Sequence, residues 1–205
     1  MSSDSWEYWH PRKEGVVEPE IPKLEEILER GCLSRILDFG CGTGRHTSYF
    51  ARKGFEVYAE RVGSLLHGEG LQADLRVLDM KEPLPYLNAF FDAVLATRVI
   101  HHTFVENIRK IVAEINRVLK AGGYVFLQVA DYEGHLRVLA ESPQTHVIVE
   151  PGTHIPMEGV EKGVPHHCFT REELLGLFPN YDVEEMHMDS DHYRGYCLIA
   201  RKVRE

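Results

Sequence analysis

The sequence predicts an α/β fold in which helices cover both faces of a doubly wound, mostly parallel sheet. Two observations support this prediction. Short apolar segments with the length of strands alternate with segments of helical periodicity from residue 19 to residue 130, and alternating strands and helices favour parallel pairing with right-handed crossovers. A turn rich in glycine, within ILDFGCGTGRH at residues 36–46, directly follows the first apolar strand. Ligands of such sheets bind beyond the carboxyl ends of the strands, so we expect a ligand at this turn.

The first half of the chain supplies two helices and three strands. A helix is expected over residues 19–30, where apolar residues recur on one face and a glycine follows. A buried strand over 35–39 then enters the glycine turn, and a helix over 44–53 ends at the next glycine. Strands are expected over 55–59 and 75–78, where the apolar residues form short runs.

The second half begins with a strand within FFDAVLA (residues 90–96), which we place at residues 91–96. Six apolar residues at helical spacing then predict a helix over 104–119. Gly122 and Gly123 are expected to end it, and the apolar run over 124–130 predicts a fifth strand.

The remaining chain has a different character. Residues 131–168 show no clear period, so we interpret them as an insertion on the ligand side. Thr170 and Glu173 have the spacing of a capping box, which predicts a helix reaching about Phe178. YDVEEMHMDS and YRGYCLIARK read as two strands separated by a few polar residues, which favours antiparallel pairing. We therefore expect one domain over 1–205.

Composition limits the class of protein. The 205 residues carry a formal net charge of −9, which disfavours binding to nucleic-acid phosphates without excluding it. No apolar run approaches the roughly 20 residues that span a bilayer, and no apolar stretch of a signal peptide follows the N-terminus. None of the four cysteines forms a C-x-x-C pair, so free thiols are expected. These features are typical of a cytoplasmic protein that does not bind membranes.

The three glycines of the turn, Gly40, Gly42 and Gly44, suggest close approach of a ligand to the backbone. A strand–turn–helix unit offers backbone N–H groups and the positive end of a helix. The dinucleotide fingerprint G-x-G-x-x-G requires glycine where this chain has Arg45, which weakens the case for a nicotinamide cofactor.

Two long segments carry a resemblance to a known family. ILDFGCGTGRHTSYFARKGFEVYA resembles the first motif of class I S-adenosyl-L-methionine-dependent methyltransferases of the type 11-like, small-molecule branch. FFDAVLATRVIHH, followed by ENIRKIVAEINRVLKAGGYVFL, resembles the fourth strand, the next helix and the fifth strand of that family. The resemblance covers roughly residues 30–130. It implies a Rossmann-like sheet of seven strands with an antiparallel C-terminal strand pair, and S-adenosyl-L-methionine as cofactor with S-adenosyl-L-homocysteine as product.

The resemblance also implies roles for single residues. Asp38 would orient the methionine ammonium group, and Asp79 would accept a hydrogen bond from the adenine amine, although both could instead be structural acids. Thr97 would line the methionine end near the sulfonium. The full set of implied cofactor-binding residues is Asp38, Gly40, Cys41, Gly42, Gly44, Glu60, Asp79, Met80, Ala96 and Thr97.

One position departs from the family. Its members usually carry an acid at the end of the second strand, which accepts both ribose hydroxyls. Counted from Gly54, this position falls on Arg61, and Glu60 stands one residue early. Since side chains alternate along a strand, Glu60 could replace the missing acid only if the strand ends sooner or bulges. The crossover over 60–74 is also near the minimum length.

Histidines are the candidate general bases, because imidazole titrates near neutral pH. His102 follows the fourth strand, and His166 and His167 end the insertion, so these three are the predicted catalytic residues, with simple packing as the alternative. His101, His166, His167 and Cys168 could converge on a metal, but they lack regular zinc spacing, so no metal is expected.

The expected function is methyl transfer to a small-molecule acceptor by in-line displacement. The alternatives are methylation of a tRNA base, since the tail is also similar to tRNA-wobble-type members, and a noncatalytic module that binds the cofactor or a partner with a degenerate ribose site. Trp6, Tyr8 and Trp9 lie in the segment 1–31, where they would form either a lid over the acceptor or a clamp on the first helix.

Overall fold

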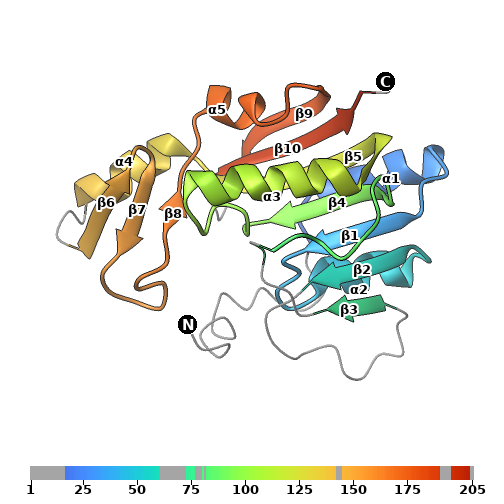
Figure 1. The fold of residues 1–205 in the computed structure, drawn as a ribbon, viewed down its shortest axis with the longest axis horizontal. Coiled ribbons are helices and arrows are strands. Elements are labelled where there is room, and N and C mark those ends of the chain that lie inside the picture. Colours follow the sequence, from blue (N-terminus) through green and yellow to red (C-terminus); the bar gives the residue numbers. More distant parts are fainter. Residues whose placement is uncertain are drawn as a thin grey trace.

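The central sheet confirms the predicted fold class. The computed structural model describes residues 17–60, 73–76, 80, 82–141, 145–189 and 195–203. Seven strands pair in the order β3–β2–β1–β4–β5–β10–β9 (Figure 1). Their bounds are β1 Arg35–Phe39, β2 Glu56–Glu60, β3 Ala73–Arg76, β4 Phe91–Thr97, β5 Leu119–Ala130, β9 Tyr181–Asp189 and β10 Gly195–Lys202. The pairs among β1 to β5 are parallel, whereas β10 pairs antiparallel with both β5 and β9.

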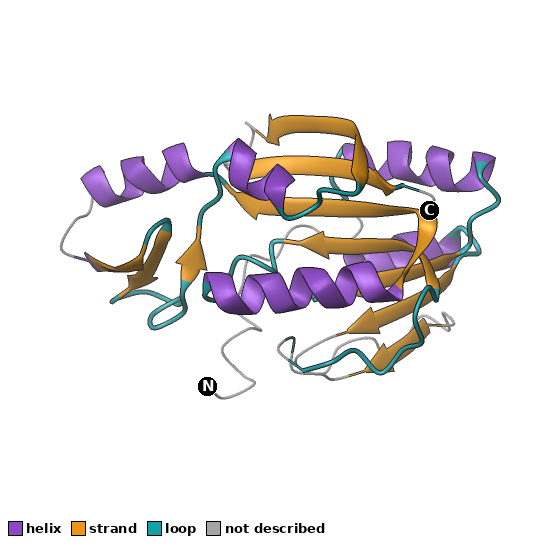
Figure 2. Ribbon diagram, turned by 45° about the horizontal axis from the view of Figure 1, so that its top comes forward, coloured by secondary structure: helices purple, strands orange, loops and turns teal. Residues whose placement is uncertain are grey.

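Helices cover both faces of this sheet (Figure 2). Their bounds are α1 Glu20–Arg30, α2 Arg45–Arg52, α3 Val105–Val118 and α5 Arg171–Gly176. The core on one face joins α1 and α2 to the sheet, and the core on the other joins α3 and α5. Neighbouring residues of β1 divide between them, with Ile36 in the first core and Leu37 in the second. This alternation follows from the period of two along a strand buried on both faces.

The segment 131–168 contains regular structure that the sequence pattern did not reveal. It folds into α4 Tyr132–Glu141 and a small sheet of β6 His146–Glu150, β7 Thr153–Pro156 and β8 His166–His167. In Figure 1 the arrowheads of β1 and β4 point toward the end of the molecule that carries these elements. The small sheet was missed because the apolar residues of β6 are exposed and the buried residues of β7 and β8 are mostly threonine and histidine, so no apolar period marks these strands.

Four of the strands β1 to β5 differ from their predicted bounds. β2 covers Glu56–Glu60 where we expected 55–59, and β4 covers Phe91–Thr97 where we expected 91–96. β3 covers Ala73–Arg76, whereas the apolar pattern placed it at 75–78. β5 begins at Leu119, because Gly122 adopts a φ of 80° and the pairing with β4 continues past a register shift. Glycine reaches such a φ without a steric penalty, so the chain bulges here where we expected a break.

One of the two hydrogen bonds of the predicted capping box is confirmed, the one accepted by the Thr170 side chain. Thr170 precedes α5, and its Oγ1 accepts a hydrogen bond of 3.1 Å from the Glu173 backbone N–H. The helix ends at Gly176, two residues before the expected end at Phe178.

Replacing Thr170 with alanine should lower the free energy of unfolding by about 1 kcal/mol, because the cap is lost. Chemical denaturation of wild type, Thr170→Ala and Thr170→Ser measures this. The serine variant keeps the hydroxyl and should retain most of the stability; equal losses in both variants would contradict the capping role.

Several sequence predictions lie outside the described residues. They concern the aromatic cluster of Trp6, Tyr8 and Trp9 and most of the short crossover between β2 and β3. Among the described residues, no helix combines the length and the apolar character that a membrane crossing requires.

Candidate functional site

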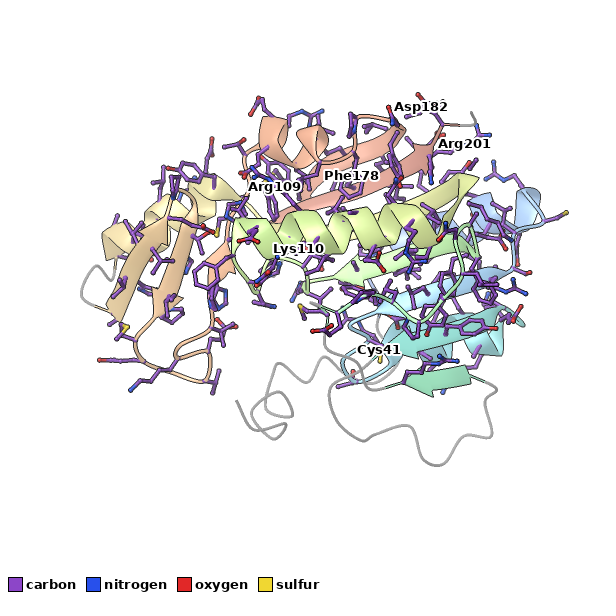
Figure 3. All side chains as sticks on the ribbon, in the orientation of Figure 1. Cys41, Arg109, Lys110, Phe178, Asp182 and Arg201 are labelled. Carbon is purple, nitrogen blue, oxygen red and sulfur yellow. The ribbon has the colours of Figure 1, made fainter. Side chains whose placement is uncertain are left out.

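The loop that follows β1 has the backbone of a ligand-binding turn. Gly40, Gly42 and Gly44 all have positive φ, at 71°, 55° and 79°. Gly44 stands at the N-cap of α2, and its N–H donates to the Cys41 carbonyl at 2.8 Å. The loop therefore leads directly into the N-terminal turn of a helix, where backbone N–H groups favour a polar or negatively charged ligand group. Figure 3 labels Cys41 on this loop.

The first two glycines serve different purposes. A Cβ placed on Gly40 would lie 2.4 Å from Val99 Cγ2, so this glycine is required by packing against the loop between β4 and α3. A Cβ placed on Gly42 would have no heavy atom of the described residues within 4 Å. Of the two, Gly42 is therefore the position that leaves space for a ligand.

Asp38 lies just before this loop and is 2% exposed. Its Oδ2 accepts a hydrogen bond of 2.6 Å from Thr47 Oγ1 in α2. In the sheet it stands opposite Ala59 of β2 and Leu95 of β4. The carboxylate is thus held in one orientation at the start of the glycine loop, which fits either of its predicted roles.

The end of β4 contributes a second polar group. Thr97 Oγ1 is buried and has no hydrogen-bond partner among the described residues. The neighbouring Ala96 is fully buried in the core below α3. A buried hydroxyl without a partner is unfavourable unless a ligand or water satisfies it, so Thr97 marks a polar position at the carboxyl end of the sheet.

The predicted contacts to the ribose and adenine are only partly described. β2 ends at Glu60, which stands opposite Phe39 of β1. The Glu60 side chain, Arg61 and Asp79 lie outside the described residues. Met80 is partly buried and packs against the core.

Glu18 is a residue of this region that the sequence reasoning missed. It is 1% exposed and contacts Arg45 and His46, which form the first turn of α2 directly after the glycine loop. Burial acts to raise the pKa of Glu18, but the hydrogen bond and charge of His46 and the charge of Arg45 outweigh it and lower the pKa to about 2. No periodicity or motif around Glu18 indicated this contact.

Three histidines from two distant segments meet at the carboxyl end of β4. The ring centroids of His101 and His102 are 4.0 Å apart, and His166 of β8 lies 4.9 Å from His102 and 6.3 Å from His101. A fourth ring, His154 of β7, stacks on His166 at 5.4 Å. The predicted catalytic residues His102 and His166 therefore share one cluster. Of the four residues whose convergence the sequence raised, His101 and His166 belong to it.

Burial suppresses protonation in this cluster. It lowers the pKa of His101 and His102 well below the usual value, and like charges on neighbouring imidazoles would add to the effect. Burial also lowers the pKa of His166 to about 4. The three imidazoles are consequently neutral near pH 7.

His167 points to a different environment. Its Nδ1 lies 2.8 Å from Thr153 Oγ1, and its Nε2 lies 3.1 Å from Glu173 Oε1. Burial lowers the pKa of His167, while the nearby Glu173 acts in the opposite direction. His167 lines a cavity of about 180 Å³ between α3 and α5, together with Arg109, which Figure 3 labels in this region. The three predicted catalytic histidines therefore do not form one site.

Comparison with known proteins gives a family match over the sheet and the glycine loop. A family model described as a methyltransferase domain matches residues 37–127. A ubiquinone biosynthesis O-methyltransferase from Xylella fastidiosa is 32% identical over 144 residues, which are 64% of this chain and 58% of that protein. A tRNA (carboxymethyluridine(34)-5-O)-methyltransferase from Arabidopsis thaliana is 33% identical over 117 residues, 54% of this chain and 27% of that protein. This chain spans less than two thirds of the length of these relatives.

A solved structure shows the same fold over most of the chain. A SAM-dependent methyltransferase from Methanosarcina mazei has a TM-score of 0.72 at 22% identity, covering 90% of this chain and 98% of that one. The family match includes most of β1, the glycine loop and β4, which carry the resemblance to the first motif and the fourth strand. Residues 37–127 therefore match a methyltransferase domain, and the chain has the fold of the Methanosarcina mazei methyltransferase over most of its length.

Proposed function

We propose that this protein transfers a methyl group from S-adenosyl-L-methionine to a small-molecule acceptor and releases S-adenosyl-L-homocysteine. The observation that carries the proposal is the open space at Gly42, which lies between the end of β1 and the N-terminal turn of α2. This space occurs within the part of the chain that matches the methyltransferase domain.

The residues around that space fit the cofactor. Asp38 is a carboxylate suited to an ammonium group, and the partnerless hydroxyl of Thr97 lies at the end of the adjacent strand β4. Gly42 is exposed, and its positive φ is a conformation that glycine adopts without strain. The other proposed contacts are Gly40, Cys41 and Gly44 in the loop, Ala96 in β4, and Asp79 and Met80 toward the nucleoside end. Glu60 is not among them, because β2 pairs regularly with β1 as far as Glu60 and neither ends sooner nor bulges there.

When bound, the cofactor supplies a methyl group already activated by its sulfonium. An acceptor atom in line with that methyl group would take it from the sulfur and give up a proton. The protein's part is to align the acceptor with the methyl group and to exclude water.

Titration calorimetry with S-adenosyl-L-methionine and S-adenosyl-L-homocysteine tests the proposal. Gly42→Ala should weaken binding of both by at least about tenfold, because its Cβ enters the ligand space. Gly54→Ala is the matched control: Gly54 also has a positive φ and open surroundings, but it lies at the other end of α2. Equal affinity in the two variants, or no binding by wild type, would overturn the proposed site.

Thr97→Val should leave the protein as stable or more stable while it weakens cofactor binding. Replacing a buried hydroxyl that lacks a partner by a methyl group should leave the unfolding free energy unchanged or raise it by up to about 1 kcal/mol. The same change should weaken cofactor binding about five- to tenfold, since one hydrogen bond to the ligand is lost.

Thr47→Val is the comparison for this prediction. Its hydroxyl donates to Asp38, so valine at this position should destabilise the protein by about 1.5–3 kcal/mol. Thermal denaturation and calorimetry measure both quantities. A Thr97→Val protein that is destabilised yet binds the cofactor normally would contradict the role given to Thr97.

We base the proposed class of methyl acceptor on the net charge of the protein. The net charge of −9 disfavours a polyanionic acceptor, which supports a small molecule over tRNA. The Arabidopsis relative keeps tRNA as the second candidate.

The acceptor is tested by measuring release of S-adenosyl-L-homocysteine with a metabolite extract and with total tRNA. Turnover with the extract alone supports the proposal, and turnover that ribonuclease abolishes supports tRNA. Cofactor binding without turnover on any acceptor supports the noncatalytic alternative.

The three predicted catalytic histidines are poorly suited to act as a general base. His102 and His166 would hold a proton poorly because burial lowers the pKa of each. Burial lowers the pKa of His167 as well, and its two ring nitrogens already contact Thr153 Oγ1 and Glu173 Oε1. We therefore propose that turnover does not depend on His167 as a general base, and retained turnover in His167→Gln is the expected result.

A further inference from the structure

We propose that His101, His102 and His166 form a binding site for a divalent transition-metal ion of the Zn²⁺ type. One ring nitrogen from each histidine can be chosen so that all three lie within 4.8 Å of one another. This inference does not depend on the proposed methyl transfer, because it rests on the geometry of the cluster.

The backbone fixes the positions from which the three rings converge. The His102 N–H donates to the Val99 carbonyl at 3.2 Å, which closes a turn after β4. The His167 N–H donates to the His101 carbonyl at 2.8 Å, which ties β8 to that turn. These backbone hydrogen bonds hold the turn after β4 against β8, so the backbone itself keeps the three histidines close together.

The distances suit an ion of this size. Zinc–nitrogen bonds of about 2.0–2.1 Å in a tetrahedral site place the nitrogen atoms roughly 3.4 Å apart. The rings of His101 and His102 already lie in contact, with centroids 4.0 Å apart. Side-chain rotations that move the nitrogen atoms by about 1 Å would therefore bring them to this spacing.

The donor set favours particular ions. Three neutral imidazoles suit Zn²⁺, Fe²⁺, Co²⁺ or Ni²⁺, whereas Mg²⁺ and Ca²⁺ prefer oxygen ligands. A carboxylate is also present, since Glu161 Oε2 lies 3.2 Å from His166 Nε2. Glu161 would balance part of the charge of an ion held by the histidines, and three protein ligands leave a further coordination position open.

The site lies next to the glycine loop. Val99, which packs against Gly40, precedes the histidines in the same loop between β4 and α3. An ion here would therefore be held by the loop whose Val99 contacts Gly40 and by β8 of the small sheet.

The test uses the full chain without a histidine tag, stripped with a chelator and titrated with CoCl₂. Wild type should bind one Co²⁺ per chain, with visible d–d absorption bands that ZnCl₂ removes by displacement. His102→Gln and His166→Gln should each weaken binding by about a hundredfold or more. His187→Gln is the matched control, because His187 belongs to a separate group of potential ligands with Glu20 and Cys197 and should leave the bands unchanged.

A second measurement uses the wild-type protein, so it remains informative if the variants fail to fold. Addition of Zn²⁺ to the wild-type protein should raise its melting temperature and shift the imidazole NMR signals of three histidines. Absence of Co²⁺ bands in wild type, unchanged binding in both cluster variants, or loss of binding in His187→Gln would overturn the metal site. Gly42→Ala separates the two proposals, since it should lose cofactor affinity and keep the Co²⁺ spectrum.

Discussion

Replacing Gly40 with alanine is expected to lower the free energy of unfolding by about 3–5 kcal/mol. The new Cβ would lie 2.4 Å from Val99 Cγ2 and 2.8 Å from Val99 Cβ, so the two loops would have to separate. A positive φ of 71° adds the strain of a left-handed conformation. Chemical denaturation measures the loss, and calorimetry should show reduced cofactor affinity because the loop beside Gly42 moves.

A second substitution tests the cause. Val99→Ala removes both γ carbons, so it should recover about 1–2 kcal/mol in the Gly40→Ala background while destabilising wild type. Gly54→Ala should lose only the backbone strain, about 1–2 kcal/mol, because nothing lies within 4 Å of its added Cβ. Additive effects of the Gly40 and Val99 substitutions would show that the steric contact is not the reason.

Glu18→Gln is expected to destabilise the protein on the order of 3 kcal/mol at neutral pH. The folded pKa of Glu18 is about 2, below the ordinary value of 4.5, and each pKa unit corresponds to about 1.4 kcal/mol. Since the folded pKa is lowered, the contribution is fully present above pH 4.5. It is lost as the pH falls from 4.5 toward 2, where the folded protein also takes up the proton.

The pH dependence separates this charge from a general loss of packing. Unfolding curves of wild type and Glu18→Gln at several pH values should converge as the pH approaches 2. Glu106→Gln is the control, because Glu106 forms an exposed pair with Lys110 in α3 and should not change the unfolding midpoint. A constant difference between wild type and Glu18→Gln from pH 7 to pH 2 would rule out an ionised Glu18 as the source of stability.

The sequence predicted the central sheet well because its strands are short, apolar and separated by strong helix signals. β1 was predicted without error, and α1 and α3 within one residue at each end. The segment of α4 and β6 to β8 was not predicted, because its apolar residues, such as Val147 and Ile148, are exposed and carry no period. The bulge in β5 was also missed, since Gly122 signals either a break or a bulge and only the pairing with β4 decides between them.

The sequence by itself determined the fold class and the position of the glycine loop. Local spacing suffices for both, because the period of a strand and the conformational freedom of glycine act over a few residues. The tertiary structure alone decided that Gly40 packs on Val99, that Glu18 contacts the first turn of α2, and that His166 joins His101 and His102 while His167 faces Glu173. These contacts join residues far apart in the chain, so no local pattern encodes them, and they form only when the sheet and the small sheet pack.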